Sequence, residues 1–302
     1  MSARSSRWRA REARAALVFL APALGALLLF FFVPVGASLL LSLTDFDIYA
    51  VADPGNARLV GLANYARLLH DPVFWRALVN TLVFVLACAP LTLLVALAAA
   101  LLVNSRLARA KAFFRTAYFA PVVTTLVAVA VVWRYLYHPR FGLFNRMLDW
   151  VGLGPIDWLG DPHWALFSII LLSVWKNFGY DVIILVAGLR NIPEPLYESA
   201  RIDGAGFWAQ LRHVTLPMLS PSLFFCGVIT VIGYFQVFAE PYVMTGGGGP
   251  LDATLTMALL LYKQGFRWWN MGYAATVAFV LCLVILAATA LLRRLQGKEE
   301  TA

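Results

Sequence analysis

A polar segment, Glu198-Ser199-Ala200-Arg201-Ile202-Asp203-Gly204, lies between two long apolar stretches of this chain, and Val214-Thr215-Leu216-Pro217 follows it after nine residues. The run Pro193-Glu194-Pro195 before it suits the first turn of a helix, because proline needs no N–H there and an acidic side chain favours a helix N-terminus. Glycine and proline break helices at the other end. The sequence therefore predicts a short helix over residues 196–202, opened from Asn191 onward and ended by the glycine, and a second short segment over 207–214 ended by the proline.

The composition is that of an integral membrane protein. Of the 302 residues, 61% are hydrophobic and only 13% are charged, and the mean hydropathy is +0.76. A soluble domain carries about 25% charged residues, so this chain could not cover a water-facing surface. Nothing resembling a soluble module interrupts the apolar stretches, which predicts a single membrane domain.

Six apolar stretches are long enough to cross a bilayer as helices, which takes about 20 residues. They cover approximately Ala16–Leu43, Ala77–Val103, Phe113–Leu136, Trp164–Leu189, Ser220–Val243 and Met271–Leu292. The stretches are continuously apolar and do not alternate as barrel strands do, so we expect an all-α protein with six transmembrane helices. The first stretch follows five arginines, as a signal peptide would, but it is far longer than the apolar core of about 7–15 residues that a signal peptide has, so a retained anchor is favoured.

Basic residues in the loops predict the orientation of these helices, because Lys and Arg concentrate on the cytoplasmic side. One set of segments holds fifteen basic residues, and the other holds seven together with eight of the sixteen acidic residues. The first set comprises Arg4, Arg7, Arg9, Arg11, Arg14, Arg106, Arg109, Lys111, Arg115, Arg190, Arg201, Arg212, Arg293, Arg294 and Lys298. We therefore expect both termini and the segment around Glu198 to be cytoplasmic. This distribution explains the net charge of +8, and no nucleic-acid partner is expected.

The sequence carries no motif for catalysis, ATP binding or metal binding. The glycines Gly246, Gly247, Gly248 and Gly249 precede Pro250 rather than the Lys and Ser/Thr of a phosphate-binding loop. The four histidines are scattered over different loops, and the three cysteines lie inside apolar stretches without a CxxC pair. We therefore expect no catalytic residue, metal or cofactor in this chain. The glycine run is either a flexible loop or an outer gate that contacts a partner protein.

Polar residues in the fourth and fifth stretches are candidates for a substrate path, because such groups are costly in a membrane and often functional. They are Lys176, Asn177 and Tyr180 in the fourth stretch and Tyr234, Gln236 and Glu240 in the fifth. With Asp181, the first three form a stripe that should face the bundle interior. Aromatic rings and planar polar groups suit sugars. The alternatives are neutralisation of Lys176 by a carboxylate or by helix-end carbonyls, a role in transmission between gate and loop, and interhelical hydrogen bonds for the fifth stretch.

The spacing of the opening motif matches the EAA signature of ABC importer permeases, with Ser199 at the second position and Val214 in place of isoleucine. Further matching pieces cover nearly the whole chain. They include Pro34, Ser42-Leu43-Thr44-Asp45-Phe46, Val60-Gly61-Leu62-Ala63-Asn64-Tyr65, Asn80-Thr81, Phe113-Phe114-Arg115-Thr116, Pro121, Trp175-Lys176, Ala187-Gly188-Leu189, Met244-Thr245-Gly246-Gly247-Gly248 and Gly272-Tyr273-Ala274. The chain resembles the sugar-type permease subunits of binding-protein-dependent importers, the class of maltose, lactose and glycerol-phosphate systems. It departs from them in its fourth glycine before Pro250 and in Phe238-Ala239-Glu240-Pro241, where the family commonly has Phe-Asp. Both departures lie near the expected substrate entry.

This resemblance implies a type I ABC importer permease in a prokaryotic cytoplasmic (inner) membrane. It implies a basic N-terminus (1–15), a six-helix permease domain (16–292) with a coupling loop at about 190–219, and a cytoplasmic tail (293–302). The coupling residues would be Glu198, Ser199, Ala200, Asp203, Gly204, Leu216 and Pro217. The implied partners are a second, homologous permease, two ATP-binding subunits that hold ATP and Mg, an extracytoplasmic solute-binding protein, a carbohydrate substrate and membrane lipid. The alternatives are a secondary transporter driven by an ion gradient, which would show internal repeats and paired broken helices, and a membrane enzyme.

Overall fold

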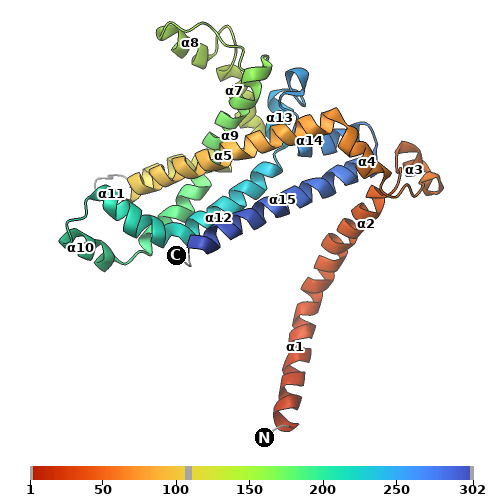
Figure 1. The fold of residues 1–302 in the computed structure, drawn as a ribbon, viewed down its shortest axis with the longest axis horizontal. Helices are drawn as coiled ribbons and strands as arrows, with labels where there is room; N and C mark the ends of the chain where they lie inside the picture. The colour runs from red at the N-terminus through yellow and green to blue at the C-terminus, as the bar shows by residue number, and fades with distance from the viewer. Residues whose placement is uncertain (1–2, 106–110, 300–302) are drawn as a thin grey trace. The chain divides into compact units, whose positions relative to one another are not determined.

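The protein is described by a computed structural model that covers residues 3–105 and 111–299, so Arg106 and Arg109 and the ends of the chain lie outside the described residues. Within these ranges every named element is a helix (Figure 1). The α-helices are α1 (Ala3–Leu27), α2 (Val33–Ser42), α3 (Ile48–Ala52), α4 (Ala63–His70), α5 (Pro72–Asn104), α6 (Lys111–Val123), α7 (Leu126–Leu136), α8 (Leu143–Trp150), α9 (Pro162–Arg190), α10 (Glu194–Ile202), α11 (Phe207–Gln210), α12 (Leu216–Phe235), α13 (Ala239–Met244), α14 (Met257–Tyr262) and α15 (Met271–Glu299).

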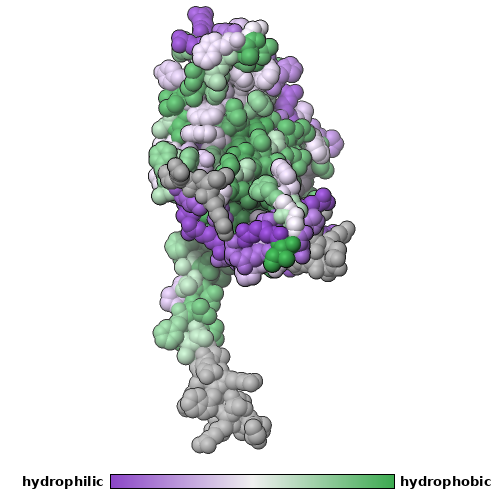
Figure 2. Space-filling view, turned by 90° about the vertical axis from the view of Figure 1, so that its left-hand side faces the viewer, coloured by the Kyte–Doolittle hydropathy of each residue, from purple (hydrophilic) through white to green (hydrophobic). Residues whose placement is uncertain are grey.

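Five continuous helical stretches are long and apolar enough to span a membrane. They are Ala15–Ser42, Pro72–Asn104, Pro162–Arg190, Phe207–Phe235 and Met271–Arg294. Hydrophobic residues cover much of the face seen in Figure 2, which suits contact with lipid rather than with water. The expected all-α membrane architecture is therefore confirmed, and each of the five stretches overlaps an expected span.

The expectation of one continuous helix over residues 113–136 is wrong. The chain breaks between α6 and α7, and the two helices meet at a bend of 98°. Pro121 lies inside the last turn of α6, where it lacks an N–H donor. The Thr124 hydroxyl donates to the Pro121 carbonyl at 2.6 Å, which satisfies that carbonyl without a further helical turn. The third span is thus a bent pair of helices.

The boundaries expected for the fifth span, 220–243, are also wrong. The helical stretch begins earlier, at Phe207, passes through a π-helical turn at Leu211–Thr215, and ends at Phe235. Pro217 does not end the preceding segment, because it lies in the first turn of α12, where proline is tolerated. The chain leaves the helix at Gln236, and α13 is a separate short helix.

The chain forms two compact units, of which the smaller comprises Met1–Leu68 with Gln264–Phe279 and the larger comprises Leu69–Lys263 with Val280–Ala302. In the smaller unit, the Asn64 amide donates to the carbonyls of Ser42 and Thr44 at 3.0 and 2.7 Å. The Arg67 guanidinium lies 4.7 Å from the centre of the Tyr273 ring. These contacts hold the end of α2, α4 and the start of α15 together.

The larger unit is built around α5, α9 and α12, and its core includes the small residues Ala96, Ala99 and Ala100 of α5. Small side chains allow membrane helices to approach closely. Helices α6 and α9 approach closely at Gly179 of α9, where an added Cβ would overlap the Tyr118 carbonyl group of α6. In Figure 1, α10 and α11 lie at the end of this unit where α5 ends and α12 begins.

Candidate coupling loop and substrate cavity

The motif around Glu198 forms a helix with a specific end. Helix α10 starts after Pro193 and ends at Ile202; Asn191, expected to open it, is instead the C-cap of α9. Gly204 has a φ of +78°, its N–H donates to the Arg201 carbonyl at 3.1 Å, and the next N–H donates to the Ala200 carbonyl at 2.8 Å. This is a Schellman motif, which favours glycine at the left-handed position. The left-handed backbone at this position therefore explains why the motif has a glycine there.

The helix presents an unusual surface for a short connecting segment. Glu198, Ser199 and Asp203 are exposed, and Ile202 is 86% exposed. Just beyond the turn, Trp208 is 77% exposed. Ala200 is half-buried. Acidic groups beside large exposed apolar side chains are typical of a surface that another protein covers.

Hydrogen bonds connect α10 to the start of α12. The Tyr197 and Thr215 hydroxyls lie 3.0 Å apart, and the Thr215 hydroxyl also donates to the Gln210 carbonyl at 3.3 Å. The Gln210 amide in turn donates to the Ala205 carbonyl at 2.7 Å. Tyr197 and Gln210 were not among the residues predicted from the sequence, although both lie within the expected coupling loop. A displacement of α10 would therefore act directly on α12.

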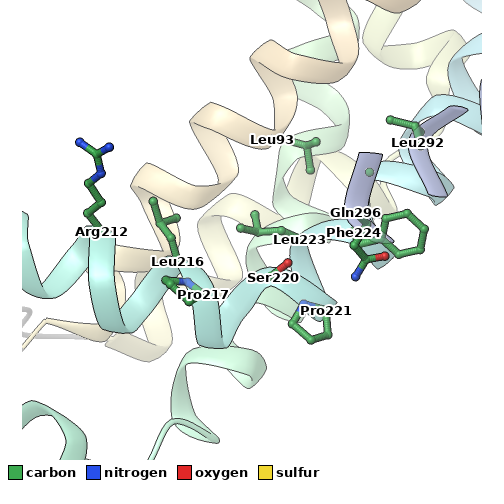
Figure 3. Close-up of a pocket in the computed structure, with 11 residues that line it drawn as sticks. Leu93, Arg212, Leu216, Pro217, Ser220, Pro221, Leu223, Phe224, Leu292 and Gln296 are labelled. Carbon is green, nitrogen blue, oxygen red and sulfur yellow. The ribbon is translucent and has the colours of Figure 1, made fainter. Parts of the chain in front are cut away.

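Leu216 and Pro217 lie away from the exposed tip of the loop. They line a groove of about 720 Å³ beside the start of α12 (Figure 3). Leu93 of α5 and Leu292 of α15 contribute to its wall, and Arg212 lies toward the end of α12 nearest the loop. The candidate coupling residues thus form two groups. Those from Glu198 to Gly204 lie in the exposed second half of α10 and the turn after it, and Leu216 and Pro217 lie at the start of α12.

Five of the six candidates for a substrate path line one cavity of about 550 Å³. They are Asn177 and Tyr180 from α9 and Tyr234, Gln236 and Glu240 from α12 and the chain after it. Asp181 and Thr230 also line this cavity; the Thr230 hydroxyl donates to Asp181 at 3.1 Å. Thr230 was missed by sequence reasoning because an isolated threonine in an apolar helix has no distinguishing pattern.

Lys176 does not line this cavity. Its side chain is buried, and the ammonium donates to the carbonyls of Pro121 and Thr124 at 3.0 and 3.1 Å. Both carbonyls lie at the break between α6 and α7, where the Pro121 carbonyl also accepts from the Thr124 hydroxyl. In a membrane an unsatisfied carbonyl is costly. The geometry therefore agrees with neutralisation by helix-end carbonyls and not with direct substrate contact.

Replacing Lys176 by methionine is expected to loosen the corner between α6 and α7. Methionine retains most of the side-chain length but removes the ammonium donor. The Pro121 carbonyl keeps the Thr124 hydroxyl, whereas the Thr124 carbonyl loses the ammonium, a loss of about 1–3 kcal/mol for a buried group. Amide exchange of residues 122–127 should accelerate in hydrogen–deuterium exchange of the purified protein, while exchange within α5 should not change. Unchanged exchange at the corner would show that the lysine does not hold it.

The remaining candidates differ in how they are held. The Tyr234 hydroxyl lies 2.7 Å from that of Thr92 and 3.4 Å from the Ser173 carbonyl, and only 5% of the residue is exposed. Gln236 is exposed and donates to Ile232 at 3.2 Å. Tyr180 is 44% exposed and lies in the cavity wall with Asn177 and Asp181. Tyr234 joins α5, α9 and α12 and offers the cavity little beyond its ring.

Tyr234→Phe is therefore expected to affect stability rather than solute recognition. Removal of the hydroxyl abolishes the interhelical hydrogen bonds, which are worth about 1 kcal/mol in total in membrane proteins. The unfolding temperature of the detergent-solubilised protein should fall, while the solute concentration for half-maximal uptake should stay within about twofold. A large change in that concentration without a fall in stability would instead identify the hydroxyl as a solute contact.

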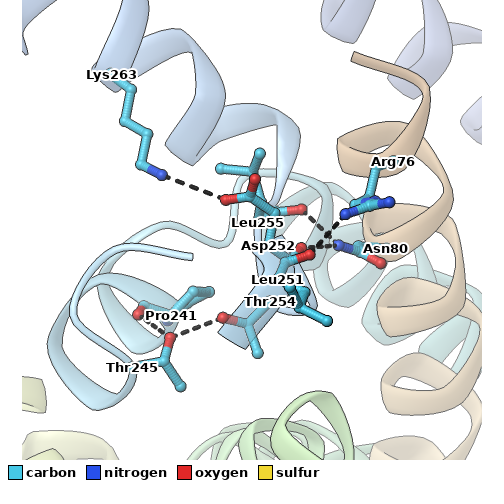
Figure 4. Close-up of polar contacts among 9 residues, drawn as sticks. All are labelled: Arg76, Asn80, Pro241, Thr245, Leu251, Asp252, Thr254, Leu255 and Lys263. Atoms are coloured by element: carbon cyan, nitrogen blue, oxygen red, sulfur yellow. Dashed lines mark hydrogen bonds and ion pairs between the residues drawn. The ribbon is translucent and has the colours of Figure 1, made fainter. Parts of the chain in front are cut away.

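The glycine run forms an ordered turn with an unusual backbone. Gly246, Gly247, Gly248 and Gly249 all have positive φ values, a conformation that glycine adopts without steric cost. As Figure 4 shows, Arg76 donates to the Leu251 carbonyl at 2.7 Å and Asn80 donates to the carbonyls of Asp252 and Leu255 at 2.9 and 3.0 Å. The hydroxyls of Thr245 and Thr254 lie 2.7 Å apart. The loop is therefore tied to α5 and closed upon itself.

Comparison with known proteins agrees with this architecture. Residues 75–299 match the family described as "Binding-protein-dependent transport system inner membrane component". The chain is 36% identical to the probable ABC transporter permease protein YurN of Bacillus subtilis, over 94% of this chain and 97% of that protein. It is 37% identical to the lactose transport system permease protein LacF of Rhizobium radiobacter, over 89% of each.

Among solved structures, the fold is similar to a chain of the bacterial alginate ABC transporter in complex with an alginate pentasaccharide-bound periplasmic protein. The TM-score is 0.74, the identity is 22%, and the match covers 95% of this chain and 96% of that one. At this identity the likeness concerns the fold alone. The ion-gradient alternative is not favoured by these matches. The chain belongs to the family of inner-membrane components of binding-protein-dependent transport systems, as a multi-pass ABC permease.

Proposed function

We propose that this chain is one membrane-spanning subunit of an importer that moves a sugar or a related carbohydrate and is driven by ATP hydrolysis in separate subunits. The observation that carries this proposal is the exposed α10 helix, whose acidic and apolar surface is joined to α12 by the Tyr197–Thr215 contact. The names of relatives such as the lactose permease support the carbohydrate assignment.

In this proposal α10 docks on an ATP-binding subunit and transmits its movement to the membrane helices. Glu198, Ser199, Asp203 and Gly204 form the docking tip, and Leu216 with Pro217 forms the base. Both termini and the loop are cytoplasmic, with residues 1–15 and 293–302 flanking one permease domain. ATP binding and hydrolysis would shift the paired permeases between two rigid arrangements that open to opposite sides.

The cavity lined by Asn177, Tyr180, Gln236 and Glu240 is the solute path in this proposal. Its amide, phenol and carboxylate groups offer both donors and acceptors for sugar hydroxyls. The ordered loop at Gly246–Gly249 would face a solute-binding protein on the outer side. Its ties to Arg76 and Asn80 support a gate that moves as one body with α5.

Reconstitution of the whole assembly tests the proposal. The chain is co-expressed with its neighbouring permease and ATPase genes, purified, and assayed for ATP hydrolysis with candidate binding proteins and sugars. Stimulation by a loaded binding protein, with uptake of its sugar into vesicles, is the expected result. If no ATPase associates with a well-folded preparation, the proposal fails.

A further inference from the structure

The cavity assigned above as the solute path has acidic side chains in its wall and no basic one among the described residues that line it. Thirteen described residues line it, two of which, Asp181 and Glu240, have carboxyl side chains. The other polar side chains are the neutral Asn177, Tyr180, Thr230, Tyr234 and Gln236, and none of these thirteen residues is Lys, Arg or His. Among the described residues, the cavity wall therefore has acidic side chains that no basic side chain of the wall balances.

The nearby lysine does not remove this asymmetry. The Lys176 ammonium interacts electrostatically with Glu240, but it donates to the carbonyls of Pro121 and Thr124 and is absent from the cavity wall. Its charge acts on Glu240 and leaves Asp181 without a cationic partner among the described residues. It presents no donor to a solute inside the cavity.

Both carboxylates are positioned by the fold. Asp181 is only 2% exposed and accepts a hydrogen bond from Thr230 of α12 at 3.1 Å. Glu240 lies at the start of the short helix α13, next to Phe238 and Ala239, which also line the cavity. Tyr180 and Phe238 add aromatic rings to the same wall. The fold thus combines fixed acceptors with apolar ring faces.

We infer that this cavity admits neutral or cationic carbohydrates and rejects anionic ones, such as uronates and sugar phosphates. An anion that enters must lose water, and this is costly unless a cation or several donors replace that water. Here it would instead meet carboxylates, and like charges in contact are strongly unfavourable. Neutral hydroxyls can donate to the same carboxylates. This inference rests on the proposed role of the cavity as the solute path.

Thiol probes of opposite charge can measure the potential of the cavity without any transported solute. A single reactive cysteine is placed in the wall by Gly233→Cys, because Gly233 lines the cavity and an added Cβ there meets no atom within 4 Å. The exposed Cys282 is replaced by serine, while Cys88 and Cys226 are buried. The assembled complex is reacted with a cationic and an anionic methanethiosulfonate. The ratio of the cationic to the anionic reaction rate is then divided by the same ratio measured for a free thiol in solution.

The normalised ratio is expected to favour the cationic reagent by about threefold or more at low salt. It should fall toward one in Glu240→Gln, and further when Asp181→Asn is added; unchanged expression and elution volume establish that these variants fold. A ratio of one or less in the parent protein would overturn the inference. So would a ratio that neither variant changes.

The ATPase assay with loaded binding proteins separates this inference from the proposed function. Stimulation by a binding protein that carries a neutral sugar supports both. Stimulation and uptake with an anionic sugar would overturn the charge selectivity while leaving the importer intact. If the thiol probes report a negative cavity but no ATPase associates with the chain, the importer proposal fails and the assignment of the cavity as its solute path fails with it.

Discussion

Replacing Gly204 by proline is expected to abolish the coupling of ATP hydrolysis to transport while the protein still inserts into the membrane. Proline requires a φ near −65°, whereas Gly204 has a φ of +78° and its N–H donates to Arg201. The Schellman turn therefore cannot form, and the tip of α10 must change its direction. Uptake into vesicles should fall by at least about tenfold, since the strain and the lost hydrogen bond together exceed about 1.4 kcal/mol.

Two other glycine substitutions separate this effect from a general disturbance of the loop. Gly204→Asn should retain much of the uptake, because asparagine tolerates the left-handed conformation. Gly206→Ala should be nearly silent, since Gly206 has a φ of −73° and open space around it. Equal losses in all three variants would contradict a specific role of the turn.

Glu198→Lys is expected to uncouple the transporter through the docking surface rather than through the backbone. Glu198 is exposed on α10, so the reversal of its charge leaves the fold unchanged. The ATPase subunit should be lost on purification, or its activity should no longer respond to a loaded binding protein. Normal uptake by this variant would mean that α10 does not dock there.

Gly179→Ala is expected to prevent α6 from packing on α9. The new Cβ would overlap the Tyr118 carbonyl oxygen and lie 2.7 Å from its carbon and 3.3 Å from the Phe119 Cα. These are backbone atoms, so the helices must separate. Overpacking of this kind costs about 1–3 kcal/mol or more. The detergent-solubilised protein should lose its symmetric elution peak and unfold at a lower temperature.

The matched control for Gly179 is Gly233→Ala in α12. Both glycines lie in membrane-spanning helices, but an added Cβ at Gly233 meets nothing within 4 Å. Its unfolding temperature should therefore equal that of the parent or exceed it slightly, because alanine favours a helix. If the two variants unfold at the same temperature, the close approach of α6 and α9 does not limit stability.

Local signals in the sequence were sufficient for much of the fold. Apolar stretches about the length of a bilayer predicted the spans, because lipid requires every backbone group to be satisfied within its own helix. The end of α10 just before Gly204 was also predictable from local sequence. Glycine adopts the left-handed conformation at lower steric cost than any other residue, so it commonly follows the end of a helix. The break after α6 was not predicted, because proline also occurs inside continuous membrane helices, as Pro90 does in α5.

The sequence by itself determined the membrane class and the short helix that ends before Gly204, since length, composition and short-range caps act within a few turns of one chain segment. The permease family followed from the resemblance of its motifs to those of known importer permeases. Only the tertiary structure decided what the polar side chains do. It directs Lys176 to carbonyls 52 and 55 residues away and joins Tyr234 to Thr92 across 142 residues. It also gathers Asp181 and Glu240 into one cavity. What a buried polar group does depends on the hydrogen-bond partners around it. Helix packing brings those partners together from distant parts of the chain, so the sequence alone does not reveal them.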